Sequence, residues 1–309
     1  MFNREIRNSV AYTLKEMRKF AKCKEELPTL KLTLRDLEQT WASIQADMYK
    51  DKKRSKEIFG KEYSLAQLNI ISLMMMSTAV NDSMENNRII QWSIQGIEPT
   101  AVIANLLIQA CNYSLSIVKL IEAGLDTPAH TLLKSLQELC WLTLTLCFER
   151  EKMEQYCMLR GLEDTEELWY KHFRPVKLKK SIKKLEGVLD FPFDLTMELN
   201  EIRDTSYRND SNFSHHRFYE SMVSAYKPRE ELFVPNFSGD LTEGCRKSLD
   251  SLNYNLWYLL QTLIKIFGEI HHWQDVEFSE VWLLTISLIE CAKEAFFVQF
   301  YEAESGNAI

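Results

Sequence analysis

The segment from Tyr207 to His216 holds the side chains best suited to chemistry, an arginine and a histidine seven positions apart. Arg208 carries a permanently charged guanidinium whose shape and charge suit phosphate oxygens. His215 carries an imidazole that takes up and releases a proton near neutral pH. This pair suffices for RNA cleavage without a metal ion. The imidazole removes the proton of a ribose 2′-hydroxyl, and the guanidinium stabilises the charge that builds on the phosphorus.

Two backbone geometries would bring this pair together. Residues seven apart on a helix lie two turns apart on one face. Alternatively, the polar run from Asn209 to Asn212 consists of poor helix formers and favours a bend. We expect a helix over about 195–207, and the polar run after it suggests a bend. Either a continuous helix or such a bend would bring Arg208 and His215 together, with Asn209 positioning them.

A basic stripe precedes this segment. No acidic residue occurs from position 171 to 184. The basic and imidazole residues are Lys171, His172, Arg174, Lys177, Lys179, Lys180, Lys183 and Lys184. Five of them, Lys177, Lys179, Lys180, Lys183 and Lys184, are predicted to bind RNA phosphates. The alternative is a solvated helix face, although the formal net charge of −7 makes this local concentration of positive charge informative.

The arginine–histidine segment resembles the motif of the HEPN-family ribonucleases. These helical bundles carry an arginine, usually followed by a polar residue, and a histidine after four to six positions. Arg208, Asn209 and His215 match that pattern with six intervening residues. The resemblance implies a HEPN-like core over about 64–224 and a homodimer in which two motifs share one active site. It also implies a function as a bacterial toxin or phage-defence effector.

The chain is also similar to an uncharacterised bacterial all-helical family. That family combines an L-x-S-L-x-E-L helix, here Leu133 to Leu139, with a later segment that contains Tyr207, Ser211 and His215. Together the two resemblances cover roughly 125–220, and they suggest supporting functions for Glu138, Tyr207 and Ser211. Glu138 stands among leucines in a helix, where an unpaired carboxylate is costly. We expect it to pair with Arg203, Arg208 or His215, as a structural contact more than a catalytic one.

The composition predicts an all-α fold. Glycine and proline number only 9 and 7, too few for the many tight turns of a β-rich protein of this length. Long apolar helices are expected near 64–93, 99–123, 127–149, 241–272 and 278–303, with the longest loop at 225–240.

Residues 1–60 are predicted to form an N-terminal helical hairpin. Ile6, Val10 and Leu14 recur at helical spacing, and the second helix carries the seam Leu34, Leu37, Trp41, Ile44 and Met48. The hairpin either packs on the main body or serves as an oligomerisation arm. The remaining residues, 61–309, are expected to form one helical bundle.

Several other classes of protein do not fit the sequence. No run of 18 uncharged apolar residues and no signal peptide is evident, so no membrane association is expected. Seven cysteines without a CxxC pair indicate a reducing compartment, and we expect a cytoplasmic protein. Glu269 and His272 have the Glu-x-x-His spacing of di-iron bundles, but no second such motif exists, so no metal is expected. Gly-rich nucleotide-binding loops and G-x-S-x-G are absent, and no cofactor is expected.

Two functions remain open from the sequence. The first is a metal-independent endoribonuclease acting on RNA. The second is a non-catalytic helical interaction or regulatory subunit with a partner protein, in which the same residues form a buried polar network. Burial discriminates between them. An open groove that contains His215 and Arg208, within reach of the stripe Lys177 to Lys184, favours the nuclease, and full burial with satisfied hydrogen bonds favours the interaction protein.

Overall fold

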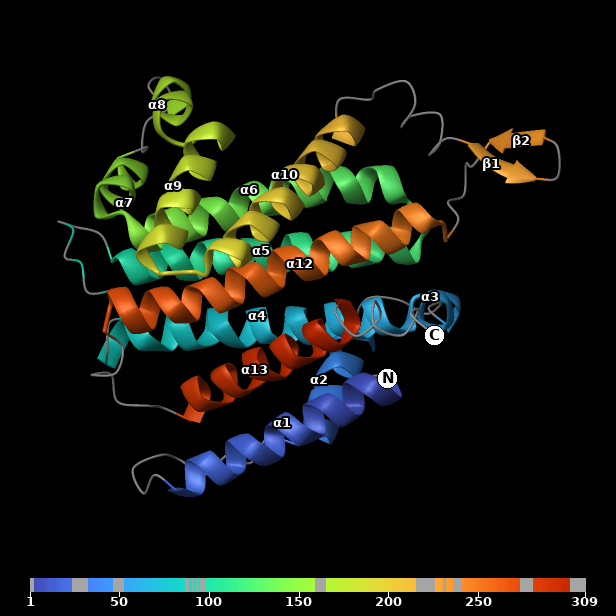
Figure 1. Ribbon diagram of the computed structural model, residues 1–309, viewed down its shortest axis with the longest axis horizontal. Helices are drawn as coiled ribbons and strands as arrows, with labels where there is room; N and C mark the ends of the chain where they lie inside the picture. The colour runs from blue at the N-terminus through green and yellow to red at the C-terminus, as the bar shows by residue number, and fades with distance from the viewer. Residues whose placement is uncertain are drawn as a thin grey trace.

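The computed structural model describes residues 3–23, 33–46, 53–86, 89–90, 92, 94, 98–158, 165–214, 226–229, 232–235, 241–272 and 280–300. The protein is an all-α helical bundle, which confirms the expected fold class (Figure 1). The helices are α1 (Arg4–Cys23), α2 (Leu34–Ala46), α3 (Lys53–Ile58), α4 (Gly60–Asn86), α5 (Pro99–Glu122), α6 (Asp126–Phe148), α7 (Arg150–Cys157), α8 (Thr165–His172), α9 (Pro175–Val188), α10 (Phe193–Ser214), α12 (Glu243–Lys265), its π-helical continuation η1 (Ile266–Ile270), and α13 (Glu280–Phe300).

The turn between α5 and α6 follows from its residues. Gly124 has a φ of 69°, in the left-handed region that glycine enters without a steric penalty. This glycine ends α5, and α6 begins two residues later at Asp126. The connection is so short that the two helices must run antiparallel as neighbours.

The core lies between α4, α5, α6 and α12, which run side by side through the bundle (Figure 1). Leu68, Ile103, Leu133 and Leu256, one from each of these helices, have no solvent exposure. Burying each such side chain stabilises the fold by about 1.5–3 kcal/mol. Helices α9 and α10 pack against α6 of this core on one side of the bundle (Figure 1).

The N-terminal helix packs into the same core. Ile6, Val10 and Leu14 are buried, as their helical spacing predicts, and α1 lies along α13. Arg7 donates to Glu38 at 2.9 Å and ties α1 to α2. The side chains of Trp41, Ile44 and Met48 in the predicted seam lie outside the described residues, and the oligomerisation arm stays a prediction.

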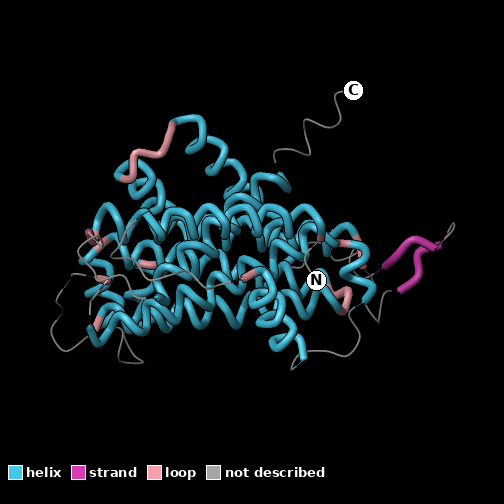
Figure 2. Tube along the Cα trace, turned by 90° about the horizontal axis from the view of Figure 1, so that it is seen from below, coloured by secondary structure: helices cyan, strands magenta, loops and turns pink. Residues whose placement is uncertain are grey.

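Two local expectations were wrong. The bend expected at 209–212 is absent, because α10 continues as one helix to Ser214. Asp210 within that run is buried and hydrogen-bonded to other helices, and such tertiary contacts override weak helix propensity. The expected loop at 225–240 contains an antiparallel hairpin of β1 (Tyr226–Arg229) and β2 (Leu232–Pro235) at one end of the bundle (Figure 2).

Among the described residues, two helical stretches are long and apolar enough to cross a membrane by length and composition, at Gly60–Ser83 and Pro99–Glu122. The most apolar window of the first is 83% buried within the bundle, and that of the second 50%. The second stretch, α5, exposes the polar side chains of Asn105, Gln109 and Asn112. Both patterns are typical of helices that pack in or against the core of a bundle.

Candidate anion-binding groove

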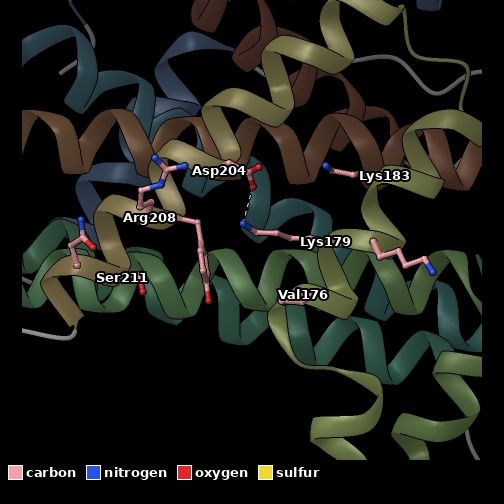
Figure 3. A pocket seen from close by; sticks show the side chains of 9 residues that line it. Val176, Lys179, Lys183, Asp204, Arg208 and Ser211 are labelled. Atoms are coloured by element: carbon pink, nitrogen blue, oxygen red, sulfur yellow. Dashed lines mark hydrogen bonds and ion pairs between the residues drawn. The ribbon is translucent and has the colours of Figure 1, made fainter.

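A groove of about 600 Å³ lies between α9 and α10 (Figure 3). One face of each helix forms a wall, since the lining residues recur at intervals of three and four. The α9 wall consists of Val176, Lys179, Lys180 and Lys183, and the α10 wall of Asp204, Tyr207, Arg208, Ser211 and Asn212. The basic stripe and the arginine segment, separate in the sequence, therefore meet in one open groove.

The groove is strongly cationic. Lys180, Lys183 and Arg208 are exposed, Lys179 is partly buried, and the one carboxylate among the lining residues is that of Asp204. Charges of one sign gathered along a concave surface raise the local concentration of the opposite ion. Although the net charge of the protein is −7, this groove attracts an anionic ligand electrostatically.

Lys179 lies where α6, α9 and α10 meet. Its ammonium is 2.7 Å from the Asp204 carboxylate, 4.6 Å from the centre of the Tyr207 ring and 5.3 Å from that of Trp141. Burial disfavours the charged form of Asp204, but the hydrogen bond from Lys179 and the charges of Lys179 and Lys183 outweigh it and lower the pKa of Asp204. Asp204 is therefore a carboxylate at neutral pH and forms an ion pair with Lys179.

Tyr207 donates a hydrogen bond of 2.8 Å to the Glu138 carboxylate on α6. Burial, followed by the contact with Glu138, raises the pKa of Tyr207 above its ordinary value, so the side chain remains a phenol. The partner expected for Glu138 was Arg203, Arg208 or His215. Among the described residues, Tyr207 takes the place expected for Arg203 or Arg208, because Arg203 turns to the other side of α10 and Arg208 faces the groove. His215 lies outside the described residues, and its pairing with Glu138 stays a prediction.

The other predicted site residues lie around the groove. Lys177 and Lys184 are exposed on α9 but do not line the groove, and the ammonium of Lys184 lies 5.3 Å from the Phe148 ring. Asn209 is exposed beside Arg208, outside the lining. His215 directly follows the last residue of α10 and lies outside the described residues.

The opposite face of α10 carries a polar cluster that sequence reasoning missed. Nδ1 of His130 lies 2.6 Å from Asp210, and Nε2 lies 3.2 Å from the Ser248 hydroxyl. The Phe213 ring stacks on the imidazole with the ring centres 4.1 Å apart. Ser251 donates to Asp210 at 3.4 Å. Desolvation raises the pKa of Asp210, against the opposing effect of His130.

The order serine, histidine, aspartate in this cluster is that of a nucleophilic triad. However, Ser248 has no exposed surface and His130 is only 5% exposed, so no substrate atom can reach the hydroxyl. The cluster instead joins α6, α10 and α12. Its members are 80 and 118 positions apart in the sequence, and no local pattern relates them.

A second buried cluster holds α9 against α10. Arg203 forms an ion pair with Glu186, and Tyr258 of α12 donates to the same carboxylate at 2.6 Å. Arg203 is 2% exposed and Glu186 is fully buried. This pair fixes the distance between the two helices that form the groove.

Within the part of the chain that the structure describes, no group of three or more His, Cys, Asp or Glu side chains could hold a metal ion. His271 of the Glu269–His272 segment is buried against Trp92, and its Nε2 lies 2.8 Å from the Cys147 carbonyl. Comparisons of the chain with protein-family models, with curated proteins and with solved structures find no match.

Proposed function

We propose that this protein is a metal-independent endoribonuclease that binds single-stranded RNA in the groove between α9 and α10. The observation that carries the proposal is that Arg208 shares one open groove with Lys179, Lys180 and Lys183. A guanidinium and ammonium groups gathered in this way are the donors that a phosphodiester backbone requires.

The dimensions of the groove favour a single strand over a duplex. A volume of about 600 Å³ accommodates a short stretch of backbone and no double helix. Lys179 and Lys183 are four residues apart on α9, so their side chains leave the helix about one turn apart, about 5.4 Å along its axis. Grooves of positive charge that track a backbone are the usual way of binding single strands.

In the proposed reaction His215 removes the proton of a ribose 2′-hydroxyl. The freed oxygen attacks the adjacent phosphorus, and the bond from phosphorus to the 5′-oxygen of the next nucleotide breaks. The products are a 2′,3′-cyclic phosphate and a 5′-hydroxyl, which takes its proton from water. Arg208 stabilises the charge that builds on the phosphoryl oxygens, and Asn209 positions His215 relative to Arg208.

The wider biological setting belongs to the same proposal. The resemblance to HEPN-family ribonucleases supports a cytoplasmic homodimer that acts as a toxin or phage-defence effector. The alternative is a non-catalytic interaction or regulatory subunit with a partner protein, which requires Arg208 and Asn209 to form a buried network. Both residues are exposed, and that exposure supports the nuclease.

The test is cleavage of total RNA in EDTA by four purified proteins: wild type, Arg208→Ala, His215→Ala and the control Arg35→Ala. Arg35 is an exposed arginine on α2, on the other side of the bundle from the groove, so the control removes the same charge elsewhere (Figure 1). Thermal unfolding first establishes that all four proteins are folded.

The proposal predicts cleavage by wild type and Arg35→Ala, with a loss of at least about 100-fold for the other two variants. Cleavage products that end in a cyclic phosphate would identify the chemistry. Intact RNA with folded wild type, or full activity of Arg208→Ala, would contradict the proposal and favour the interaction protein.

A further inference from the structure

We infer that the groove selects ribose over deoxyribose through Tyr207, whose oxygen accepts a hydrogen bond from a 2′-hydroxyl while its own hydrogen is donated to Glu138. This inference rests on the proposed function and adds to it the feature of the ligand that the groove recognises besides phosphate. The argument depends on which groups in the groove donate hydrogen bonds and which accept them.

Most of the charged groups that line the groove are hydrogen-bond donors. The ammonium groups of Lys179, Lys180 and Lys183 and the guanidinium of Arg208 are donors with no accepting capacity. Phosphate oxygens are acceptors and satisfy these groups. A sugar hydroxyl that donates needs a different partner, and these cations offer none.

Tyr207 supplies such a partner because its hydroxyl hydrogen is already donated to another residue. A phenol has one hydrogen, and that hydrogen is donated to Glu138 at 2.8 Å. Toward a ligand the Tyr207 oxygen can then only accept. Asp204, Ser211 and Asn212 also line the groove and carry accepting oxygens, so the Tyr207→Phe variant below decides which acceptor the ligand uses.

The position of Tyr207 is fixed before a ligand arrives. Its ring lies 5.1 Å from the Trp141 ring, centre to centre, and the Lys179 ammonium lies 4.6 Å from its centre. Arg208 is the next residue on α10, and both side chains line the groove. A phosphate held by Arg208 therefore brings one of its two riboses to the wall that carries Tyr207, at no cost of ordering that side chain. The 2′-hydroxyl that donates to Tyr207 is the one whose proton His215 does not remove.

The 2′-hydroxyl is the group that distinguishes RNA from DNA, and it can donate. Deoxyribose leaves the Tyr207 oxygen without this partner when the ligand displaces water. The loss of one neutral hydrogen bond corresponds to a reduction in affinity of about fivefold.

The first experiment changes only the ligand. It measures the affinity of His215→Ala, which keeps RNA intact under the proposed mechanism, for uridine decamers in EDTA. The decamers carry 2′-hydroxyl, 2′-fluoro or 2′-deoxy sugars. The 2′-fluoro sugar keeps the RNA-like pucker but has no hydrogen to donate. We expect the 2′-hydroxyl strand to bind about fivefold more tightly than both others.

The second experiment changes the protein and repeats the series in the same background. Tyr207→Phe removes the accepting oxygen and keeps the ring, so the preference for the 2′-hydroxyl strand should disappear. Lys183→Ala is the matched control, because it removes a phosphate contact without touching Tyr207. It should weaken all three strands by the same factor and leave the preference intact.

The outcomes separate this inference from the proposed function. Equal affinity for the three strands would overturn the selection of ribose while leaving binding in the groove in place. A preference that persists in Tyr207→Phe would overturn the assignment to Tyr207. If none of the strands binds, the proposed function and this inference both fail. The ligand series needs no variant at Tyr207, so a folding defect of Tyr207→Phe cannot hide the result.

Discussion

Two consecutive residues of α10 form ion pairs with the same neighbouring helix, α9, and yet they differ in almost every physical respect. Arg203 pairs with Glu186 on the inner side, where the two side chains are 2% and 0% exposed. Asp204 pairs with Lys179 at the groove, where the side chains are 45% and 24% exposed. The first pair is isolated from water, and the second is in contact with it.

The difference shows how α10 can stabilise the fold on one side and form a binding surface on the other. A buried pair cannot lose one partner without leaving an uncompensated charge in the core. A partly exposed pair is weak, because water screens both charges, so Lys179 can exchange Asp204 for a phosphate. The inner pair therefore fixes the spacing of the helices, and the outer pair remains exchangeable.

The largest effect should come from the inner pair. Arg203→Met leaves the buried Glu186 without its partner and should lower the free energy of unfolding by about 3–5 kcal/mol, measured by urea denaturation. Adding Glu186→Gln removes the second charge and retains an acceptor for Tyr258, so the double variant should recover much of the loss. If the double variant were no more stable than Arg203→Met, charge burial would not be the cause.

The second largest loss of stability should come from a change in the buried cluster of His130, Asp210 and Ser248. Asp210→Asn replaces the carboxyl partner of His130 and weakens the hydrogen bonds that Ser206 and Ser251 donate to residue 210. We expect a loss of about 1–3 kcal/mol in the free energy of unfolding. Because Ser248 is buried, the same variant should retain RNA cleavage at temperatures where it is folded. Loss of cleavage by a folded Asp210→Asn protein would mean that the cluster has a part in the chemistry.

Substitutions in the groove should change the affinity for RNA more than the free energy of unfolding. Lys183→Ala should change the free energy of unfolding by less than about 0.5 kcal/mol, as for most surface substitutions. It should lower the affinity for a uridine decamer and reduce the slope of log affinity against log salt by about 0.7. Fluorescence anisotropy over a salt series measures both quantities. An unchanged slope would place the strand away from Lys183.

Asp204→Asn should have only a small effect on stability. Because the folded protein lowers the pKa of Asp204, its contribution to stability is present above the unfolded pKa, about 3.9, and is lost as the pH falls through the lowered value. The pair is partly exposed, so we expect a cost of at most about 1 kcal/mol at neutral pH. The same change releases Lys179 and should raise RNA affinity severalfold. Weaker binding would show that Asp204 assists the ligand.

The residues on the groove side of α10 could be predicted from the sequence better than those on its buried side. The all-α fold follows from helical periodicity and the scarcity of glycine and proline. Arg208 and the lysines of α9 were identifiable because a strong concentration of charge is a local property of the chain. The meeting of the two segments was a hypothesis that depended on tertiary packing.

The inner side could not be predicted from local patterns. His130, Asp210 and Ser248 belong to three helices far apart in the chain, and the fold alone brings them together. The same contacts explain why the bend expected at Asn209 to Asn212 does not form. Burying Asp210 against His130 requires α10 to continue through that run, and tertiary contacts outweigh its low helix propensity.

The most direct test of the central claim, that the groove binds RNA through Arg208, is the affinity of a uridine decamer for three variants in EDTA. Each carries His215→Ala, so that the strand stays intact. They are the single variant, the same with Arg208→Ala, and the same with Arg35→Ala, all of confirmed thermal stability. We predict that Arg208→Ala lowers the affinity at least about tenfold, as expected for the loss of a charged hydrogen bond, and that Arg35→Ala leaves it within about twofold. Equal affinity of the two arginine variants would contradict the account and place the RNA, if it binds, on another surface.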